Sequence, residues 1–111
     1  MLAREFEYRI KRFFEEGTTE ETLFAGLASE VGEVMQSRVK ETRKGMECTA
    51  EILDELGDVL WYICAIAQAR NYSLEEVMKD VIEKLTKRDN QNHFDAYGFY
   101  KEVSLPFVLG N

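Results

Sequence analysis

Four carboxylates stand in two matching pairs along the chain. Glu30 and Glu33 are three residues apart. After 21 further residues, Glu55 and Asp58 repeat that spacing. A helix turns by about 100° per residue, so residues three apart lie on one side of it. Carboxylate oxygens without a nearby His or Cys favour a hard divalent ion such as Mg²⁺ or Mn²⁺ over zinc. The spacing therefore predicts a divalent-metal site formed by two helices.

The surroundings of the two pairs favour this prediction over the ordinary alternative. A single Glu-x-x-Glu pair on a helix is usually a solvated face. Here both pairs border an apolar stripe, and each encloses a glycine, Gly32 or Gly57, in the similar strings EVGEVM and ELGDVL. A glycine inside a helix costs about 1 kcal/mol relative to alanine, and close approach of a neighbouring helix is the usual reason to tolerate it. Four converging carboxylates would also repel one another unless a cation lay among them.

Helices must position these pairs, and apolar periodicity predicts four of them. Apolar residues recur at steps of three and four along residues 2–16, 19–42, 49–70 and 74–88. Thr18 and Glu21 form a capping-box pattern before the second helix. Ser73 and Glu76 form another before the fourth. Short connections between successive helices favour antiparallel packing. The predicted fold class is therefore all-α, an antiparallel four-helix bundle with an irregular, aromatic-rich C-terminal tail.

Length and composition limit the remaining possibilities. The 111 residues suggest one helical domain over residues 1–88, followed by a tail at 89–111 that packs on the domain or on a partner subunit. His93, the only histidine, is assigned no role. The net charge of −7 argues against a nucleic-acid polymer or an anionic membrane surface as partner. Cys48 and Cys64 lack disulfide or metal spacing, which indicates reduced thiols and a cytoplasmic protein.

The acidic helices resemble those of a known family, the MazG-like all-α nucleoside triphosphate pyrophosphohydrolases. LASEVGEVMQ and ELGDVLWYICAIA are similar to the two metal-binding helices of that family. The fourth helix is similar to a family segment that ends in Lys-Leu-x-x-Arg, here Lys84-Leu85-x-x-Arg88. The resemblance covers residues 20–88 and not the tail. Many relatives carry Asn three residues before that lysine, where this chain has Val81.

The resemblance implies an enzyme that hydrolyses nucleoside triphosphates to the monophosphate and pyrophosphate, in nucleotide-pool control or removal of non-standard nucleotides. It implies Mg²⁺, with Mn²⁺ as the alternative, held by four residues: Glu30, Glu33, Glu55 and Asp58. Glu33 is the expected general base. The resemblance also implies self-association as a homodimer or homotetramer. A dUTP or dCTP pyrophosphatase, a phosphoribosyl-ATP pyrophosphohydrolase, and a non-enzymatic acidic dimerisation or regulatory module stay open as alternatives.

Four further residues are expected to contact the substrate. Lys84 and Arg88 lie four apart and could bind phosphates, although cations in a last helical turn ordinarily complement the helix dipole. Lys40 lies two turns beyond Glu33 and could reach the same pocket or be solvated. Tyr62 shares the acidic face and could stack on a base or pack in the protein. The Trp61 side chain points about 100° away from that of Tyr62 around the helix, and it is expected in the core or an interface.

Overall fold

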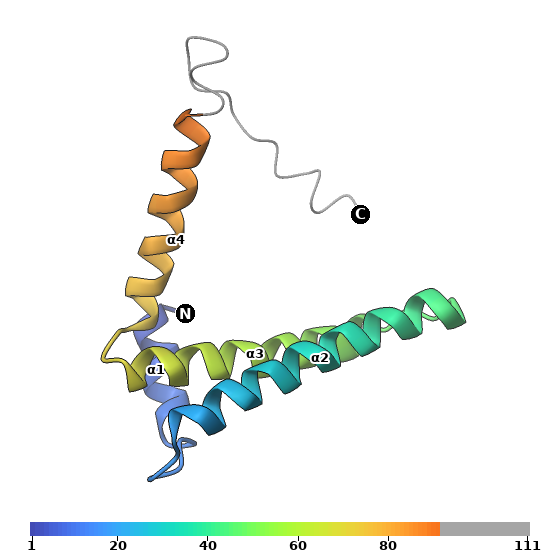
Figure 1. Ribbon diagram of the computed structural model, residues 1–111, viewed down its shortest axis with the longest axis horizontal. Helices are drawn as coiled ribbons and strands as arrows, with labels where there is room; N and C mark the ends of the chain where they lie inside the picture. Colours follow the sequence, from blue (N-terminus) through green and yellow to red (C-terminus); the bar gives the residue numbers. More distant parts are fainter. Residues whose placement is uncertain (92–111) are drawn as a thin grey trace. The chain divides into compact units, whose positions relative to one another are not determined.

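The computed structural model describes residues 1–91, and these form four helices (Figure 1). They are α1 (Ala3–Lys11), α2 (Glu20–Lys44), α3 (Thr49–Ala69) and α4 (Leu74–Asp89). The described residues contain no strand, so the predicted all-α class is confirmed. The chain divides into two units between Val77 and Met78, and α4 runs from the first into the second. His93 and nearly all of the predicted tail lie outside the described residues.

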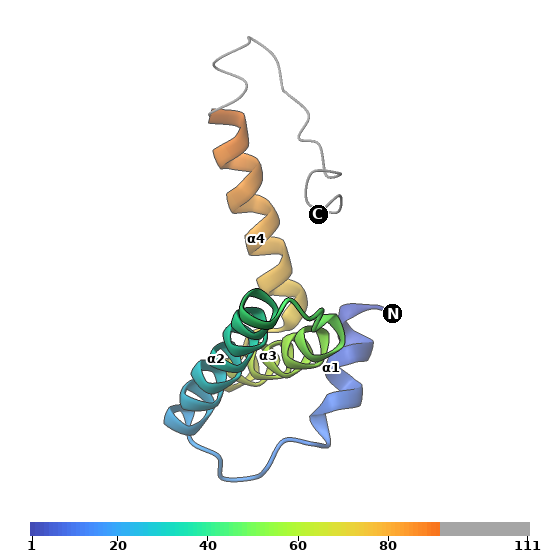
Figure 2. The ribbon, with the colours of Figure 1, turned by 90° about the vertical axis from the view of Figure 1, so that its right-hand side faces the viewer.

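Helices α2 and α3 form an antiparallel hairpin in which they lie side by side (Figure 1; Figure 2). Gly45 ends α2 in the left-handed conformation, with φ 64°, which costs glycine little. At this end the Glu41 carboxylate accepts a hydrogen bond of 2.8 Å from the Cys48 backbone N–H. At the other end the Arg70 guanidinium donates to both carboxylate oxygens of Glu20, at 2.7 and 3.0 Å. Polar contacts therefore tie both ends of the hairpin.

The corner between α3 and α4 combines two local signals. Asn71 adopts φ 63°, and its N–H donates to the Gln68 carbonyl while the Tyr72 N–H donates to the Ala67 carbonyl. This pair of bonds is the Schellman motif that ends many helices. In the predicted capping box, the Ser73 hydroxyl accepts from the Glu76 N–H, and the Glu76 carboxylate accepts from the Ser73 N–H, each at 3.1 Å. That prediction is confirmed.

One predicted helix end and one predicted capping residue are wrong. Helix α1 ends at Lys11 instead of residue 16, because the backbone N–H groups of Phe13 and Phe14 donate to carbonyls three residues earlier and not four. The Phe14 ring then packs edge-on against Trp61, with 5.1 Å between the ring centroids. The N-cap of α2 is Thr19, whose side chain accepts from the Thr22 N–H. The Thr18 hydroxyl instead donates to the Glu15 carbonyl. The capping box expected at Thr18 therefore does not form, and the N-cap lies one residue later.

The buried core of the described residues is small. Its hydrophobic members are Leu23, Cys48, Cys64, Ala65, Ala67 and Leu74. Both cysteines are free and buried, as predicted for unpaired thiols, and burial raises the pKa of Cys64 to about 11. Large apolar side chains of α2 and α3 remain exposed: Phe24, Val31, Met35, Val39, Leu53, Leu56 and Leu60. None of the described helices is long and apolar enough to cross a bilayer.

Candidate metal centre

The hairpin brings acidic side chains of both helices to one place. Glu30 comes from α2, and Glu55 and Asp58 come from α3. One carboxylate oxygen from each lies within 4.8 Å of the others. The antiparallel arrangement sets the first pair of carboxylates against the second, which is the convergence that the sequence spacing predicts. Three oxygens this close can contact one small ion.

Glu33 stands outside this group of three oxygens but interacts with it. The interaction with the Glu33 side chain is the largest cause that raises the pKa of Glu55 to about 7, and burial and Glu30 add to it. The pKa of Glu30 is also raised, chiefly because burial disfavours its charged form. All four predicted carboxylates therefore act on one another, with Glu33 at the exposed edge.

Two buried oxygens in this cluster have no hydrogen-bond donor among the described residues. They are Oε2 of Glu30 and Oε2 of Glu55. Each faces other carboxylates, which can only accept hydrogen bonds when ionised. A buried, unsatisfied carboxylate oxygen is costly unless a proton or a cation reaches it. Because every atom available here as a metal ligand is a carboxylate oxygen, the site fits a hard ion such as Mg²⁺ or Mn²⁺.

A cavity of about 330 Å³ adjoins the carboxylates, and Glu30, Asp58, Trp61 and Tyr62 line it. Tyr62 therefore lies beside the acidic cluster, where its position on the helix predicts it. Trp61 was expected in the core or an interface. It packs edge-on against the rings of Phe14 and Tyr62, at 5.1 and 4.9 Å, and also forms part of the cavity wall. Its spacing of three residues from Asp58 is the signal that could have placed it here.

A glycine outside the acidic strings positions Tyr62. A Cβ at Gly26 would overlap the Tyr62 ring, so the absence of a side chain on α2 allows that ring to lie against the helix. For Gly32 and Gly57, nothing lies within 4 Å of an added Cβ. The prediction that a neighbouring helix approaches closely at Gly32 and Gly57 is therefore wrong within the described chain. The close contact between α2 and α3 is made at Gly26, against the Tyr62 ring.

The predicted phosphate contacts lie in both units of the chain, and Lys40 is the one that shares a unit with the carboxylates. Lys40 forms an ion pair of 3.0 Å with Glu51, which raises the pKa of Lys40, and it does not line the cavity. Glu51 lies outside the three-oxygen group. Lys84 and Arg88 are exposed on α4, within the second unit. Their role at the carboxylates stays a prediction.

A comparison with protein families agrees with this geometry. The family model described as MazG nucleotide pyrophosphohydrolase domain matches residues 18–93, which is more than half of the chain and contains all four carboxylates. No curated protein and no solved structure matches the chain significantly.

Proposed function

Since the chain belongs to the MazG nucleotide pyrophosphohydrolase family, we propose that it is a Mg²⁺-dependent nucleoside triphosphate pyrophosphohydrolase. It cleaves the substrate between the α and β phosphates and releases a nucleoside monophosphate and pyrophosphate, with a role in nucleotide-pool control. The observation that carries the proposal is the meeting of three carboxylate oxygens from two helices, two of the side chains having a buried oxygen without a donor.

The positions of the carboxylates indicate which of them bind the metal ion and which accepts a proton. Glu30, Glu55 and Asp58 would hold Mg²⁺ (Mn²⁺ as a substitute) through their oxygens. Glu33 would join them as a ligand, as the sequence spacing predicts. When bound, the ion supplies positive charge for the triphosphate and acidifies water. Glu33 is exposed and outside the three-oxygen group, so its carboxylate is the one available to accept the proton of the attacking water.

The nucleotide itself meets aromatic and basic residues. Tyr62 contacts the base at the cavity wall, where the missing side chain of Gly26 leaves room for its ring. Lys40 binds phosphate after leaving Glu51, and Lys84 and Arg88 bind phosphate from α4. These assignments, and a cytoplasmic location, follow from the sequence patterns and are parts of the proposal.

Self-association is also part of the proposal, as a homodimer or homotetramer. Seven large apolar side chains on α2 and α3 are exposed, which is a large apolar surface for two helices. Gly32 and Gly57 lie open on the same helices and leave room for the backbone of a second copy. A helix hairpin with so small a buried core gains stability by burying this surface against another copy.

The decisive experiment incubates the protein with each ribo- and deoxynucleoside triphosphate and Mg²⁺, and measures pyrophosphate and orthophosphate separately. We expect pyrophosphate with at least one nucleotide. Asp58→Asn should lower turnover by at least about 100-fold. Asp54→Asn, an exposed aspartate on the same helix outside the cluster, should keep it.

A second measurement tests the metal site without catalysis. Saturating Mg²⁺ binds only the folded site, so it should raise the unfolding temperature of the wild type and of Asp54→Asn more than that of Asp58→Asn. Absence of pyrophosphate across the whole panel, with folded, metal-binding protein, would contradict the enzyme. It would leave the non-enzymatic helical module as the better account.

A further inference from the structure

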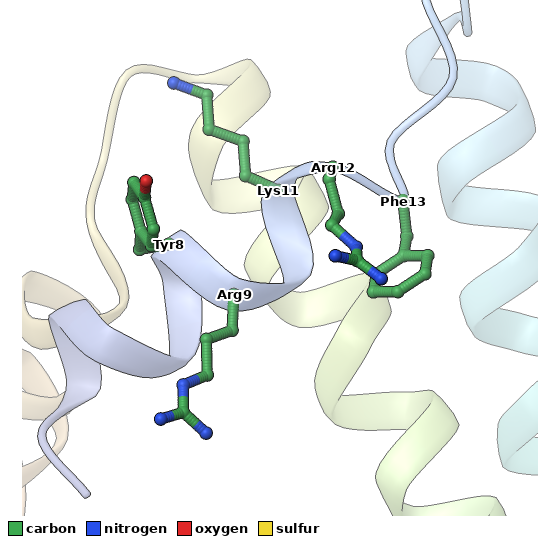
Figure 3. A pocket seen from close by; sticks show the side chains of 5 residues that line it. All are labelled: Tyr8, Arg9, Lys11, Arg12 and Phe13. Atoms are coloured by element: carbon green, nitrogen blue, oxygen red, sulfur yellow. The ribbon is translucent and has the colours of Figure 1, made fainter.

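A second cavity, with opposite charge, lies along the end of α1 and the turn that follows it. It has a volume of about 650 Å³, and the described residues that line it are Tyr8, Arg9, Lys11, Arg12 and Phe13 (Figure 3). This volume is in the range of small-molecule sites, roughly 300–1,000 Å³. None of the five residues lines the carboxylate cavity. The two cavities therefore have separate walls.

The cations of this cavity are not neutralised by the described part of the chain. Within residues 1–91, Arg38, Lys40 and Arg70 form ion pairs, whereas Arg9, Lys11 and Arg12 form none. Residues 1–13 contain four cations and two acids, in a chain whose net charge is −7. Three like charges held along one short segment repel one another, and an anion among them removes that cost.

Aromatic rings lie among these cations. Tyr8 is 81 % exposed and Phe13 is 59 % exposed, although large rings are usually at least half buried. The Arg12 guanidinium lies 4.8 Å from the centre of the Phe13 ring, a cation–π contact. Figure 3 shows Tyr8 and Lys11 extending to one side of α1 and Arg12 lying beside Phe13. A cation and an aromatic face thus stand next to each other at Arg12 and Phe13, whereas Arg9 extends to the other side of α1.

We propose that this α1 cavity is a second nucleotide-binding site that requires no metal ion. Arginine and lysine bind phosphate oxygens directly, and exposed aromatic faces stack on bases. Three cations match the two or three negative charges of a nucleoside monophosphate or diphosphate. The carboxylate cluster, in contrast, repels phosphate unless a metal ion lies between them. The two sites therefore differ in metal dependence, and this difference separates them experimentally.

The test measures nucleotide binding to the full chain by calorimetry in EDTA, with AMP, GMP, CMP, UMP and ADP as probes. EDTA removes the ion that the carboxylate site needs, so we expect saturable binding of one nucleotide per chain at the α1 cavity. Arg9→Gln/Lys11→Gln/Arg12→Gln should weaken this binding at least about tenfold. The matched control Arg4→Gln/Arg43→Gln/Lys44→Gln loses the same charge outside the cavity lining and should bind as the wild type does.

The aromatic contribution distinguishes a nucleotide site from a patch for any polyanion. Tyr8→Ser should weaken nucleotide binding by about tenfold while leaving the binding of inorganic tripolyphosphate unchanged. Tyr8 is exposed, so this variant should keep its helical circular dichroism. Fold and binding are therefore measured independently.

Four results would overturn the proposal. They are absence of binding in EDTA, equal weakening in the matched control, tripolyphosphate binding as tight as nucleotide binding, and clear preference for a single-stranded oligonucleotide over a mononucleotide. The pyrophosphate assay does not bear on this site. A failure of the proposed activity would leave binding in EDTA intact, and a failure of binding in EDTA would leave the activity intact.

Discussion

Within the carboxylate cluster, Glu55 is a residue whose charged form is strongly disfavoured by its neighbours. It interacts with Glu33 and Glu30 across the hairpin, and its pKa is raised to about 7. Its Oε2 atom is buried without a hydrogen-bond donor among the described residues. Without a metal ion, a proton is the remaining way to relieve repulsion at this carboxylate. At the proposed metal site, protons and metal ions would therefore compete for Glu55 near neutral pH.

This competition predicts how stability depends on pH in EDTA. The pKa of Glu55 lies above its ordinary value of 4.5 in the folded protein, so the folded state holds the proton more tightly. The resulting stabilisation is complete below about pH 4.5 and is lost as the pH rises through about 7. We expect the unfolding temperature of the wild type to fall more between about pH 5 and about pH 8 than that of Glu55→Gln.

The control for this measurement is Glu16→Gln, which changes an exposed glutamate outside the helices and should follow the wild type. Added Mg²⁺ should flatten the wild-type pH dependence, because the ion replaces the proton. Parallel curves for wild type and Glu55→Gln in EDTA would show that Glu55 does not titrate as described.

Gly26→Ala tests the packing of Tyr62 against α2. The new Cβ would overlap the Tyr62 ring, so the ring or the helix must move, and overpacking of this kind costs about 1–3 kcal/mol. In a Tyr62→Ala background the overlap is gone, and the same substitution should instead stabilise the helix by about 1 kcal/mol. Urea unfolding of the four proteins measures both steps. An equal cost in both backgrounds would exclude the contact as its cause.

At the scale of elements, local signals predict helices well and their ends less well. The capping box at Ser73 is found as predicted because both partners lie within four residues of each other. The end of α1 was misplaced because it depends on the Phe14 ring meeting Trp61, a contact between residues 47 positions apart. Helical periodicity alone does not contain that contact.

The start of α2 gives a prediction that separates two adjacent threonines. Thr19→Ala removes the oxygen that accepts from the Thr22 N–H, and should destabilise the protein by about 1 kcal/mol. Thr18→Ala removes only an exposed bond to the Glu15 carbonyl, and should stay within about 0.5 kcal/mol of the wild type. Chemical denaturation resolves the difference. The reverse order of the two costs would restore Thr18 as the cap.

At the scale of the whole molecule, exposed apolar surface on the hairpin predicts association of copies. Leu53 on α3 is 63 % exposed and Met35 on α2 is 57 % exposed. Light scattering coupled to gel filtration should give two or four times the 12.9 kDa mass of one chain. Leu53→Glu should shift this mass to that of a single chain, because a charge buried at the interface is costly.

Met46→Glu serves as the matched control. Met46 is 53 % exposed in the loop between α2 and α3, outside the helical faces. This variant should keep the mass of the wild type. A wild type that elutes as one chain at high concentration would contradict self-association through the hairpin.

The order of residues is enough to predict the helices, the two acidic pairs and the family. Each of these depends on spacing within a helix or across one hairpin, which the order of residues states directly. Three features emerge only from the packing of the helices: Trp61 lines the carboxylate cavity, Gly26 and not Gly32 or Gly57 receives a neighbouring side chain, and Lys40 pairs with Glu51. These depend on the register and rotation of α2 against α3, which packing of side chains from both helices sets.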